Sequence, residues 1–260
     1  MITSTSNQRI KEIVQLQKKS RARNTEGVFI VEGIRMVREI PEDKLKALYV
    51  TEEFYKKHKA ELPVNVKPEF VTPTVFSYIA DTKTPQGVLA IVCQNKYTLI
   101  DILKKDTEKK EMLLVLDNLQ DPGNLGTIFR TAEAAGVTGI ILSKDSVDIY
   151  NPKVIRSTMG AIFRMPFVYV EKLTDTIEEL KRHQIQVYAA HLDGKNAYDE
   201  ENYLNGTAYL IGNEGNGLRQ EVADCADTWI RIPMLGQAES LNAAVAASIL
   251  MFEAARQRRK

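Results

Sequence analysis

Three polar loops that contain glycine hold the residues most able to do chemistry. Each follows an apolar run: DNLQDPGNLG at 117–126, GNEGNG at 212–217 and PMLGQAESLN at 233–242. In open α/β sheets, ligands bind beyond the carboxyl ends of the strands. If the apolar runs are strands of one sheet, the three loops form a single composite pocket.

The loop at 212–217 invites comparison with phosphate-binding loops. A P-loop requires G-x-x-x-x-G-K-[ST], but neither Lys-Ser nor Lys-Thr follows Gly217. The dinucleotide fingerprint requires G-x-G-x-x-G near the start of a βαβ unit, whereas the order here is G-x-x-G-x-G, late in the chain. By itself the loop is more typical of a glycine turn, with Glu214 as its one carboxylate.

The other two loops allow both a structural and a functional interpretation. Ser240 precedes an apolar helix and could be its N-cap, which requires no ligand. Arg130 lies off the apolar stripe of its predicted helix, where most arginines are solvated. An arginine two turns beyond a glycine loop can also hold a phosphate with its planar fork. None of the three histidines has a Ser or Cys nucleophile pattern nearby, so a hydrolytic triad has no support.

Alternating strands and helices must position these loops in the second part of the chain. MLLVLD at 112–117 is a continuous apolar run, as expected of a strand buried on both faces of a parallel sheet. A helix should follow, with Asp121 as N-cap, Pro122 in its first turn and Gly136 at its end. The last helix, 241–260, is apolar nearly all round, so both faces need cover, and a subunit interface is one way to supply it.

The first part of the chain predicts a separate small α/β domain. A helix is expected at about 7–19, followed by a polar loop, SRARNTEG, that Gly27 closes. Alternating strands and helices continue to residue 97. The lysine-rich segment 98–110 is expected as a linker. The predicted domains are therefore 1–97 and 111–260.

Composition excludes several classes of protein. The 260 residues are 44% hydrophobic and 27% charged, as in ordinary globular proteins. No apolar stretch approaches the roughly 20 residues that a membrane helix needs, and MITSTSNQRIKEI lacks the apolar core of a secretory signal. Cys93 and Cys225 offer neither a disulfide framework nor zinc-ligand spacing. We therefore expect a cytoplasmic protein without a metal.

Charge is unevenly distributed along the chain. Residues 1–97 carry 16 lysines and arginines against 11 acidic residues, and the remainder carries 19 against 23. Clustered positive charge attracts a nucleic-acid backbone, although a solvated helix face and loop would explain the same pattern. If RNA is the partner, we expect contacts from six residues: Arg9, Lys18, Lys19, Arg21, Arg23 and Arg35.

Taken together, the three loops resemble the three motifs of the SpoU (TrmH-type) family of SPOUT-class RNA 2′-O-ribose methyltransferases. DPGNLGTIFRTAEAAGV resembles the first motif, LIGNEGNGL the second and IPMLGQAESLNAAVAASI the third. NPKVIRSTMGAIFRMP at 151–166 is similar to the family as well. VFIVEGIRMVREI, near the N-terminus, resembles the family's substrate-binding domain, a small α/β fold related to a ribosomal RNA-binding protein.

The resemblance implies a parallel α/β sheet whose C-terminal part forms a deep trefoil knot, a rare exception among folds. It also implies a homodimer through the knot domain, with residues of both subunits near the pocket. S-adenosylmethionine is the implied methyl donor, held largely by backbone groups. By position, five residues are expected to bind it: Gly212, Ile232, Leu241, Ile211 and Met234.

By the same resemblance, five residues line the reaction centre: Asn124, Arg130, Glu214, Ser240 and Asn242. A guanidinium barely deprotonates in proteins, so we expect Arg130 to orient the target ribose and phosphate and to stabilise the developing alkoxide. Glu214 and Asn124 would hold the guanidinium, and Ser240 and Asn242 would shape the pocket.

The implied reaction is transfer of a methyl group to a ribose 2′-hydroxyl of RNA. Because the first domain resembles that of ribosomal-RNA enzymes, we favour 23S ribosomal RNA over transfer RNA. A non-catalytic RNA-binding or ribosome-assembly factor on the same fold is the alternative from another class. The sequence does not specify the nucleotide.

Overall fold

The structure, a computed structural model, describes residues 1–103 and 110–259. It divides into two compact units. The first combines Met1–Asn95 with Asp148–Phe163, and the second combines Lys96–Val147 with Arg164–Lys260. The first unit is thus built from two pieces of chain, whereas the predicted first domain is one continuous segment.

The first unit is a four-stranded sheet with helices packed on it. Its strands lie in the order β1-β4-β2-β3; β4 is antiparallel to β1 and β2, and β3 is parallel to β2. The strands are β1 Val28–Glu32, β2 Leu45–Val50, β3 Glu69–Phe70 and β4 Val88–Cys93. The helices are α1 Gln8–Lys18, α2 Ser20–Glu26, α3 Ile34–Val37, α4 Glu52–His58, α5 Pro73–Ile79 and α8 Pro152–Thr158, with 3₁₀ turns η1 Glu42–Lys44, η2 Lys59–Glu61 and η3 Ala161–Phe163.

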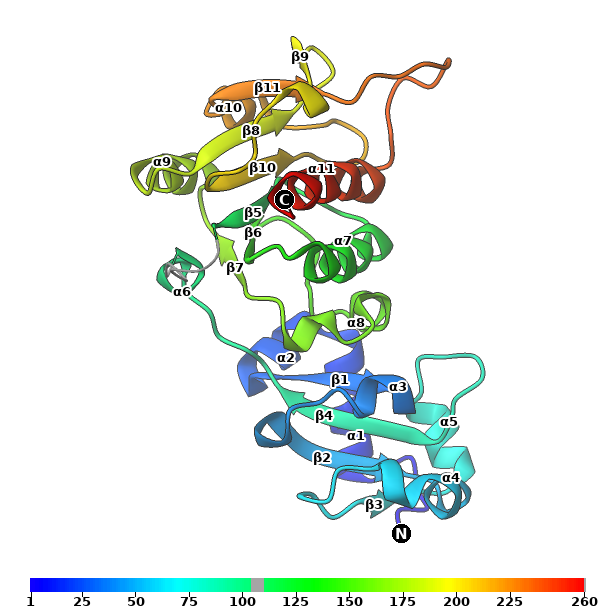
Figure 1. Cartoon of the computed structure of the whole chain (residues 1–260). Helices are drawn as coiled ribbons and strands as arrows, with labels where there is room; N and C mark the ends of the chain where they lie inside the picture. The colour runs from blue at the N-terminus through cyan, green and yellow to red at the C-terminus, as the bar shows by residue number, and fades with distance from the viewer. Residues whose placement is uncertain (104–109, 260) are drawn as a thin grey trace. The chain divides into compact units, whose positions relative to one another are not determined.

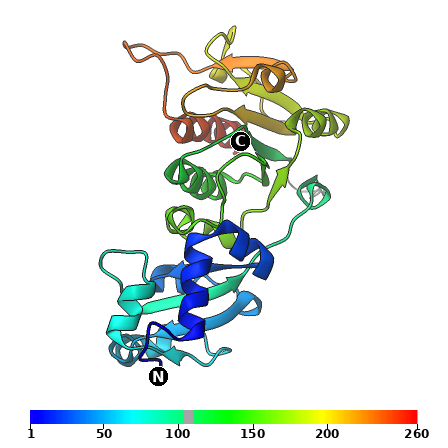
Figure 2. The ribbon, with the colours of Figure 1, turned by 180° about the vertical axis from the view of Figure 1, so that it is seen from behind.

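Helix α1 lies across one face of this sheet, as Figure 2 shows from behind. It buries Ile10, Ile13 and Leu16 against Val28 and Ile30 of β1. These three positions are spaced by three residues, so they form one apolar stripe on the helix. The predicted helix at 7–19 is confirmed.

The prediction of a polar loop at SRARNTEG is wrong, because Ser20–Glu26 form helix α2. Arg23 is 3% exposed and donates to the carbonyl oxygens of Leu16 (2.7 Å) and Gln17 (3.1 Å). Its guanidinium also pairs with the Asp148 carboxylate at 2.5 Å. These contacts hold a turn that apolar periodicity could not reveal. Gly27 ends the segment as predicted, with φ +62°, a conformation that favours glycine.

The second unit is a parallel seven-stranded sheet in the order β7-β6-β5-β10-β8-β11-β9 (Figure 1). The strands are β5 Met112–Leu116, β6 Gly139–Ser143, β7 Phe167–Val170, β8 Gln186–Ala190, β9 Asn196–Ala197, β10 Thr207–Ile211 and β11 Thr228–Arg231. The helices are α6 Leu99–Leu103, α7 Pro122–Ala135, α9 Leu173–Arg182, α10 Gln220–Ala223 and α11 Ala243–Arg258, with the 3₁₀ turn η4 Tyr198–Glu200.

Strand β5 is completely buried, as the continuous apolar run predicts. Side chains of β5 and β10 on one face, including Leu113 and Leu210, share a core with α6, α9 and α10. Figure 1 shows α7 and α11 side by side on the opposite face. The segment expected as a linker therefore begins with a helix, α6, that contributes Ile102 to this core, while 104–109 lie outside the described residues.

The ends of α7 are built as the sequence predicts. The Asp121 side chain accepts from the Asn124 N–H at 2.7 Å, Pro122 begins the helix and Gly136 ends it with φ +80°. At α11, the N-cap is Asn242 rather than Ser240: its side-chain oxygen accepts from the N–H groups of Ala244 (2.9 Å) and Val245 (3.3 Å). None of the helices in the described part of the chain is long and apolar enough to cross a membrane.

Candidate active site

The site forms where strands β5 and β10, neighbours in the parallel sheet, both end. The loop after β5 leads into α7, and the loop after β10 carries GNEGNG. The third loop ends at the N-cap of α11, which packs beside α7. Parallel strands expose their carboxyl ends at one edge, so these segments meet although they lie far apart in sequence.

Glu214 is the centre of a hydrogen-bond network between the loops. Its Oε1 accepts from the Asn124 side-chain amide and from the Asp121 N–H, both at 3.0 Å. Its Oε2 accepts from the Gln120 N–H at 3.2 Å. The carboxylate of the second motif is thus bound by backbone and side-chain donors of the first.

Asn242 joins the third motif to the same network. Its Nδ2 donates to Asn124 Oδ1 at 2.9 Å, while its own Oδ1 caps α11. Asn124 therefore uses both ends of its amide, one toward Glu214 and the other toward Asn242. Three of the five residues predicted for the reaction centre form one chain of hydrogen bonds.

The hydrogen bonds favour the ionised form of Glu214. Partial burial of the carboxylate raises its pKa. The hydrogen bonds from Asn124, Asp121 and Gln120 favour the ionised form, and together they lower the pKa by more than burial raises it. The net result is a pKa below the ordinary value of 4.5. Glu214 is therefore an anion at neutral pH.

Arg130 does not take part in this network. It lies on α7, six residues beyond Asn124, which places the two side chains on different faces of the helix. The Arg130 side chain is exposed and has neither a hydrogen bond nor an ion pair among the described residues. Within this chain Glu214 accepts from Asn124 and from two backbone N–H groups, and its expected pairing with Arg130 stays a prediction.

A cavity of about 410 Å³ opens beside the network, and all five residues predicted to bind the cofactor line it: Gly212, Ile232, Leu241, Ile211 and Met234. Ser240 and Glu214 line it as well. Ser240 is thus placed beside the cavity rather than in the hydrogen-bonded chain. Aliphatic residues and glycines make up most of the lining, and the charged residues Asp193 and Arg231 line it as well.

Gly212 is required by the shape of its loop. A Cβ at this position would lie 2.1 Å from the carbonyl carbon of Gly217 and 2.2 Å from the N atom of Leu218. The loop closes on itself at that point, because Asn213 and Gly217 exchange N–H···O bonds of 2.9 and 3.0 Å. Gly212 thus allows close backbone packing at the wall of the cavity.

The cavity suits S-adenosylmethionine in size and chemistry. Small-molecule sites have apolar walls and a few polar groups that fix orientation. Here aliphatic side chains line the wall, and the polar loop 213–217 forms one side of it. Across residues 1–103 and 110–259 there is no group of three or more His, Cys, Asp or Glu residues that could hold a metal.

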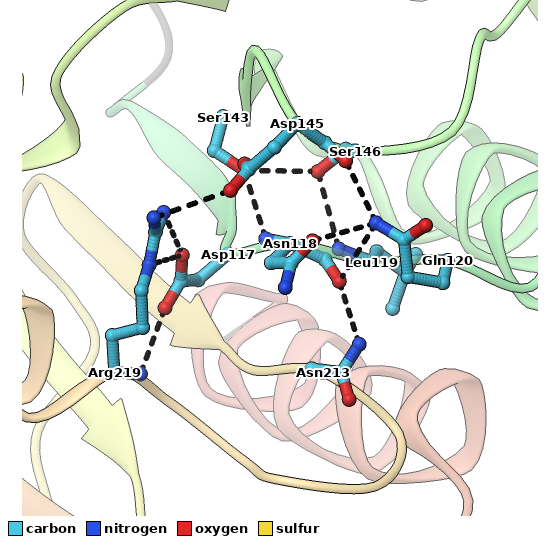
Figure 3. A network of polar contacts seen from close by, with 9 residues as sticks. All are labelled: Asp117, Asn118, Leu119, Gln120, Ser143, Asp145, Ser146, Asn213 and Arg219. Carbon is cyan, nitrogen blue, oxygen red and sulfur yellow. Dashed lines mark hydrogen bonds and ion pairs between the residues drawn. The ribbon is translucent and has the colours of Figure 1, made fainter.

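Five residues that sequence patterns did not single out join the ends of β5, β6 and β10 in a polar network (Figure 3). Asp117, fully buried, binds the Arg219 guanidinium, which raises the pKa of that group. Ser143 Oγ accepts from the Asn118 N–H at 2.8 Å, and Asn213 Nδ2 donates to the Asn118 carbonyl at 2.8 Å. One signal was available: Asp117 is a carboxylate directly after a buried strand, and such a charge needs a partner.

The predicted RNA-binding residues lie in the first unit and differ in exposure. Arg9, Lys18, Lys19, Arg21 and Arg35 are exposed, and Arg9 pairs with Glu69 at 2.5 Å. Arg23 is buried, and four of its five N–H groups bind Asp148 and the carbonyl oxygens of Leu16 and Gln17. Burial and pairing therefore argue against Arg23 as an RNA contact and for a structural role.

The first unit also has a cavity of its own, of about 470 Å³. Phe54, Phe76 and His58 line it, together with Gln86 and Gly87. The Phe54 and His58 rings stack with centroids 4.6 Å apart. Phe54 and Phe76 are only 5% and 2% exposed, so their rings belong to the packed wall of this cavity.

Both units match known protein families. Residues 111–252 match the SpoU rRNA Methylase family, and residues 7–90 match the MRM3-like substrate binding domain. A relative from Bacillus subtilis (strain 168), the 23S rRNA (guanosine(2553)-2′-O)-methyltransferase RlmP, is 33% identical over 96% of this chain and 97% of its own length.

Solved structures agree with these matches. An AdoMet-bound rRNA methyltransferase from Sinorhizobium meliloti has a TM-score of 0.82 and 33% identity, over 98% of this chain and 97% of that one. The A. aeolicus TrmH/SpoU tRNA modifying enzyme has a TM-score of 0.52 and 29% identity, and covers 62% of this chain and 81% of its own. The first of the two therefore matches nearly the whole of this chain, and the second a smaller part.

Proposed function

Since this chain belongs to the SpoU rRNA Methylase family, we propose that it transfers a methyl group from S-adenosylmethionine to a ribose 2′-hydroxyl of 23S ribosomal RNA. One observation supports this most directly. The hydrogen-bonded chain Glu214–Asn124–Asn242 lies beside the cavity that the predicted cofactor-binding residues line. The same loops thus join a ligand cavity to fixed polar groups.

S-adenosylmethionine supplies an activated methyl group. The backbone at Gly212 and the side chains of Ile232 and Leu241 would bind it. Asn124 and Glu214 would hold the two loops at a constant separation, so that the ribose oxygen meets the methyl carbon in line. Positioning of this kind supplies much of the rate acceleration in a transfer between two bound groups.

Arg130 would act across a homodimer. Its side chain is exposed on α7, which packs against α11, and α11 itself leaves Val245 and Phe252 each 48% exposed. A second copy that covers this apolar face would bring Arg130 to the partner's pocket, where it would orient the target phosphate and stabilise the alkoxide. We also propose that the loops around the cavity thread into the trefoil knot that the family resemblance implies.

Ribosomal RNA is the favoured substrate because of the first unit. The B. subtilis relative, named for 23S rRNA, spans both units, whereas the tRNA-modifying relative covers 62% of the chain. The exposed basic residues of α1 and α2 would contact phosphates. Modification of ribosomal RNA would take place in the cytoplasm.

A direct assay tests the proposal. Purified protein is incubated with radiolabelled S-adenosylmethionine and either 23S rRNA transcripts or bulk tRNA, and 2′-O-methyl positions are then mapped. We expect label in one 23S nucleotide, protection of that position from alkaline cleavage, and loss of the site in cells that lack the gene. Label in tRNA alone would show that tRNA and not 23S rRNA is the substrate. No label in any RNA would support the non-catalytic alternative.

A further inference from the structure

The loop that carries Glu214 is fastened at both of its ends by a single residue of another loop. At its start, the Asp117 N–H donates to the Ile211 carbonyl at 2.8 Å. At its finish, Asp117 Oδ2 accepts from the Arg219 backbone N–H at 2.8 Å, and Oδ1 accepts from the Arg219 Nε at 2.8 Å and from its Nη2. Figure 3 shows the Asp117 carboxylate between the guanidinium and the backbone N–H of Arg219.

Burial makes this contact different from a surface ion pair. The Asp117 side chain is 0% exposed, whereas that of Arg219 is 41% exposed. A buried carboxylate needs compensation by hydrogen bonds, and a guanidinium supplies two from one rigid fork. Arg219 Nη1 binds the Asp145 carboxylate at 3.2 Å, so the guanidinium is held by two carboxylates.

Asp117 also begins the loop that holds Glu214. Three residues later, the Gln120 N–H binds Glu214 Oε2, and the Asp121 N–H and the Asn124 side chain bind Oε1. The Asn213 side chain adds a further link, to the Asn118 carbonyl. The two loops are thus tied at Asp117, at Asn118 and at Glu214, and only the last of these ties includes a predicted site residue.

We propose that Arg219 and Asp117 are a positioning pair for methyl transfer: they set the separation of the Glu214 loop from the Asn124 loop, and with it the shape of the cofactor cavity. Neither residue is among those that line the cavity, so the pair acts through the loops and not by contact with the ligand. This inference rests on the function proposed above.

Arg219→Met tests the pair directly. Methionine has a similar reach without charge, the position is partly exposed, and the backbone N–H of residue 219 still donates to Asp117 in the variant. The matched control is Arg164→Met: Arg164 lies in the same unit, its side chain is 44% exposed, and its Nε binds Glu133 at 2.5 Å.

For Arg219→Met we expect affinity for S-adenosylmethionine, measured by calorimetry, to fall about fivefold and kcat at saturation to fall about tenfold, since small misplacements cost one to two orders of magnitude. The KM for RNA should stay within about twofold, because the predicted RNA contacts lie in the first unit. Arg219→Lys should recover part of the loss, since it restores the charge without the fork. The control should keep wild-type affinity and kcat.

Two results would overturn the inference: wild-type affinity and kcat in Arg219→Met, or an equal loss in Arg164→Met. If Arg219→Met does not fold, Arg219→Lys decides: a loss of about threefold or more in kcat at wild-type Tm supports the pair, and wild-type kcat refutes it. Failure of the proposed function is distinguishable, because the wild-type protein would then transfer no methyl group while cofactor affinity still compares the variants.

Discussion

The polar site of the second unit and the basic surface of the first unit are built in opposite ways. Around Glu214 and Asn124, side chains are joined by hydrogen bonds across 90 to 118 residues of sequence. At the junction of α1 and α2, Lys18, Lys19 and Arg21 are consecutive or nearly so, and all three are exposed. The side chains of the site are therefore held in place before a ligand binds, whereas those of Lys18, Lys19 and Arg21 can change rotamer.

This difference has a consequence for mutation. Removal of one member of a network leaves its partners unsatisfied, so the loss exceeds that of a single contact. Removal of one exposed lysine subtracts only a screened charge. Arg23 is the informative exception: it lies within the basic stretch but is buried and paired like a member of the site.

The largest effect is expected at Asn124. Asn124→Ala removes a donor to Glu214 and the acceptor of Asn242. We expect kcat to fall about 100-fold or more, as when one pre-organised polar group is lost from an active site. Steady-state kinetics measure it. The control is Asn196→Ala, which removes a similar amide from Glu201 away from the cavity and should leave kcat unchanged. Equal losses in both variants would contradict the network.

Arg23→Met separates a structural role from RNA binding. The buried guanidinium holds Asp148 and two carbonyl oxygens, so its loss should lower the free energy of unfolding by about 3 kcal/mol. Urea denaturation measures the change. Arg21→Met, exposed and two residues earlier, should change it by less than about 0.5 kcal/mol. A stable Arg23→Met protein with weakened RNA binding would restore Arg23 to the RNA contacts.

Arg130→Lys tests whether the planar fork matters. Because lysine keeps the charge and loses bidentate geometry, we expect about a tenfold fall in kcat with an unchanged Tm. Arg182→Lys, whose side chain is 73% exposed on α9, is the matched control and should have no effect. Near-full transfer by Arg130→Lys would eliminate any role that needs the fork.

The double change Lys18→Ala with Lys19→Ala should act on RNA affinity alone. We expect KM for RNA to rise about threefold and the slope of log affinity against log salt to fall by about 1 to 2, as for two lost phosphate contacts. Filter binding at several salt concentrations measures this. Lys172→Ala, an exposed lysine of the second unit, is the control. An unchanged slope would show that these lysines do not contact RNA phosphates.

The smallest effect is expected from pH. The pKa of Glu214 is lowered in the folded protein, so the stabilisation from its ionised form is complete above the ordinary pKa of 4.5 and is lost as pH falls through the lowered value. Affinity for S-adenosylmethionine should therefore change less than about twofold between pH 8 and 5. Calorimetry measures it. A loss of affinity centred near pH 6 would show that another group controls the site.

Much of the second unit could be predicted from the chain alone. Apolar runs such as MLLVLD predict buried parallel strands, and Asp121, Pro122 and Gly136 predict both ends of α7. Each of the three glycine-containing loops by itself allowed both a structural and a functional interpretation. Their order along the chain indicated the family. Helix α2 was missed because its only buried side chain is an arginine, and an apolar pattern cannot register that.

The sequence by itself determined the family motifs and the parallel alternation of strands and helices, because these depend on local pattern and motif order. Motif order also pointed to five residues that line the cavity beside Glu214. Tertiary structure alone decided the partners: Glu214 binds Asn124, Asn242 caps α11, and Asp117 holds Arg219. The physical reason is that a polar side chain pairs with whichever group the sheet edge brings within about 3 Å, and spacing along the chain does not specify that distance.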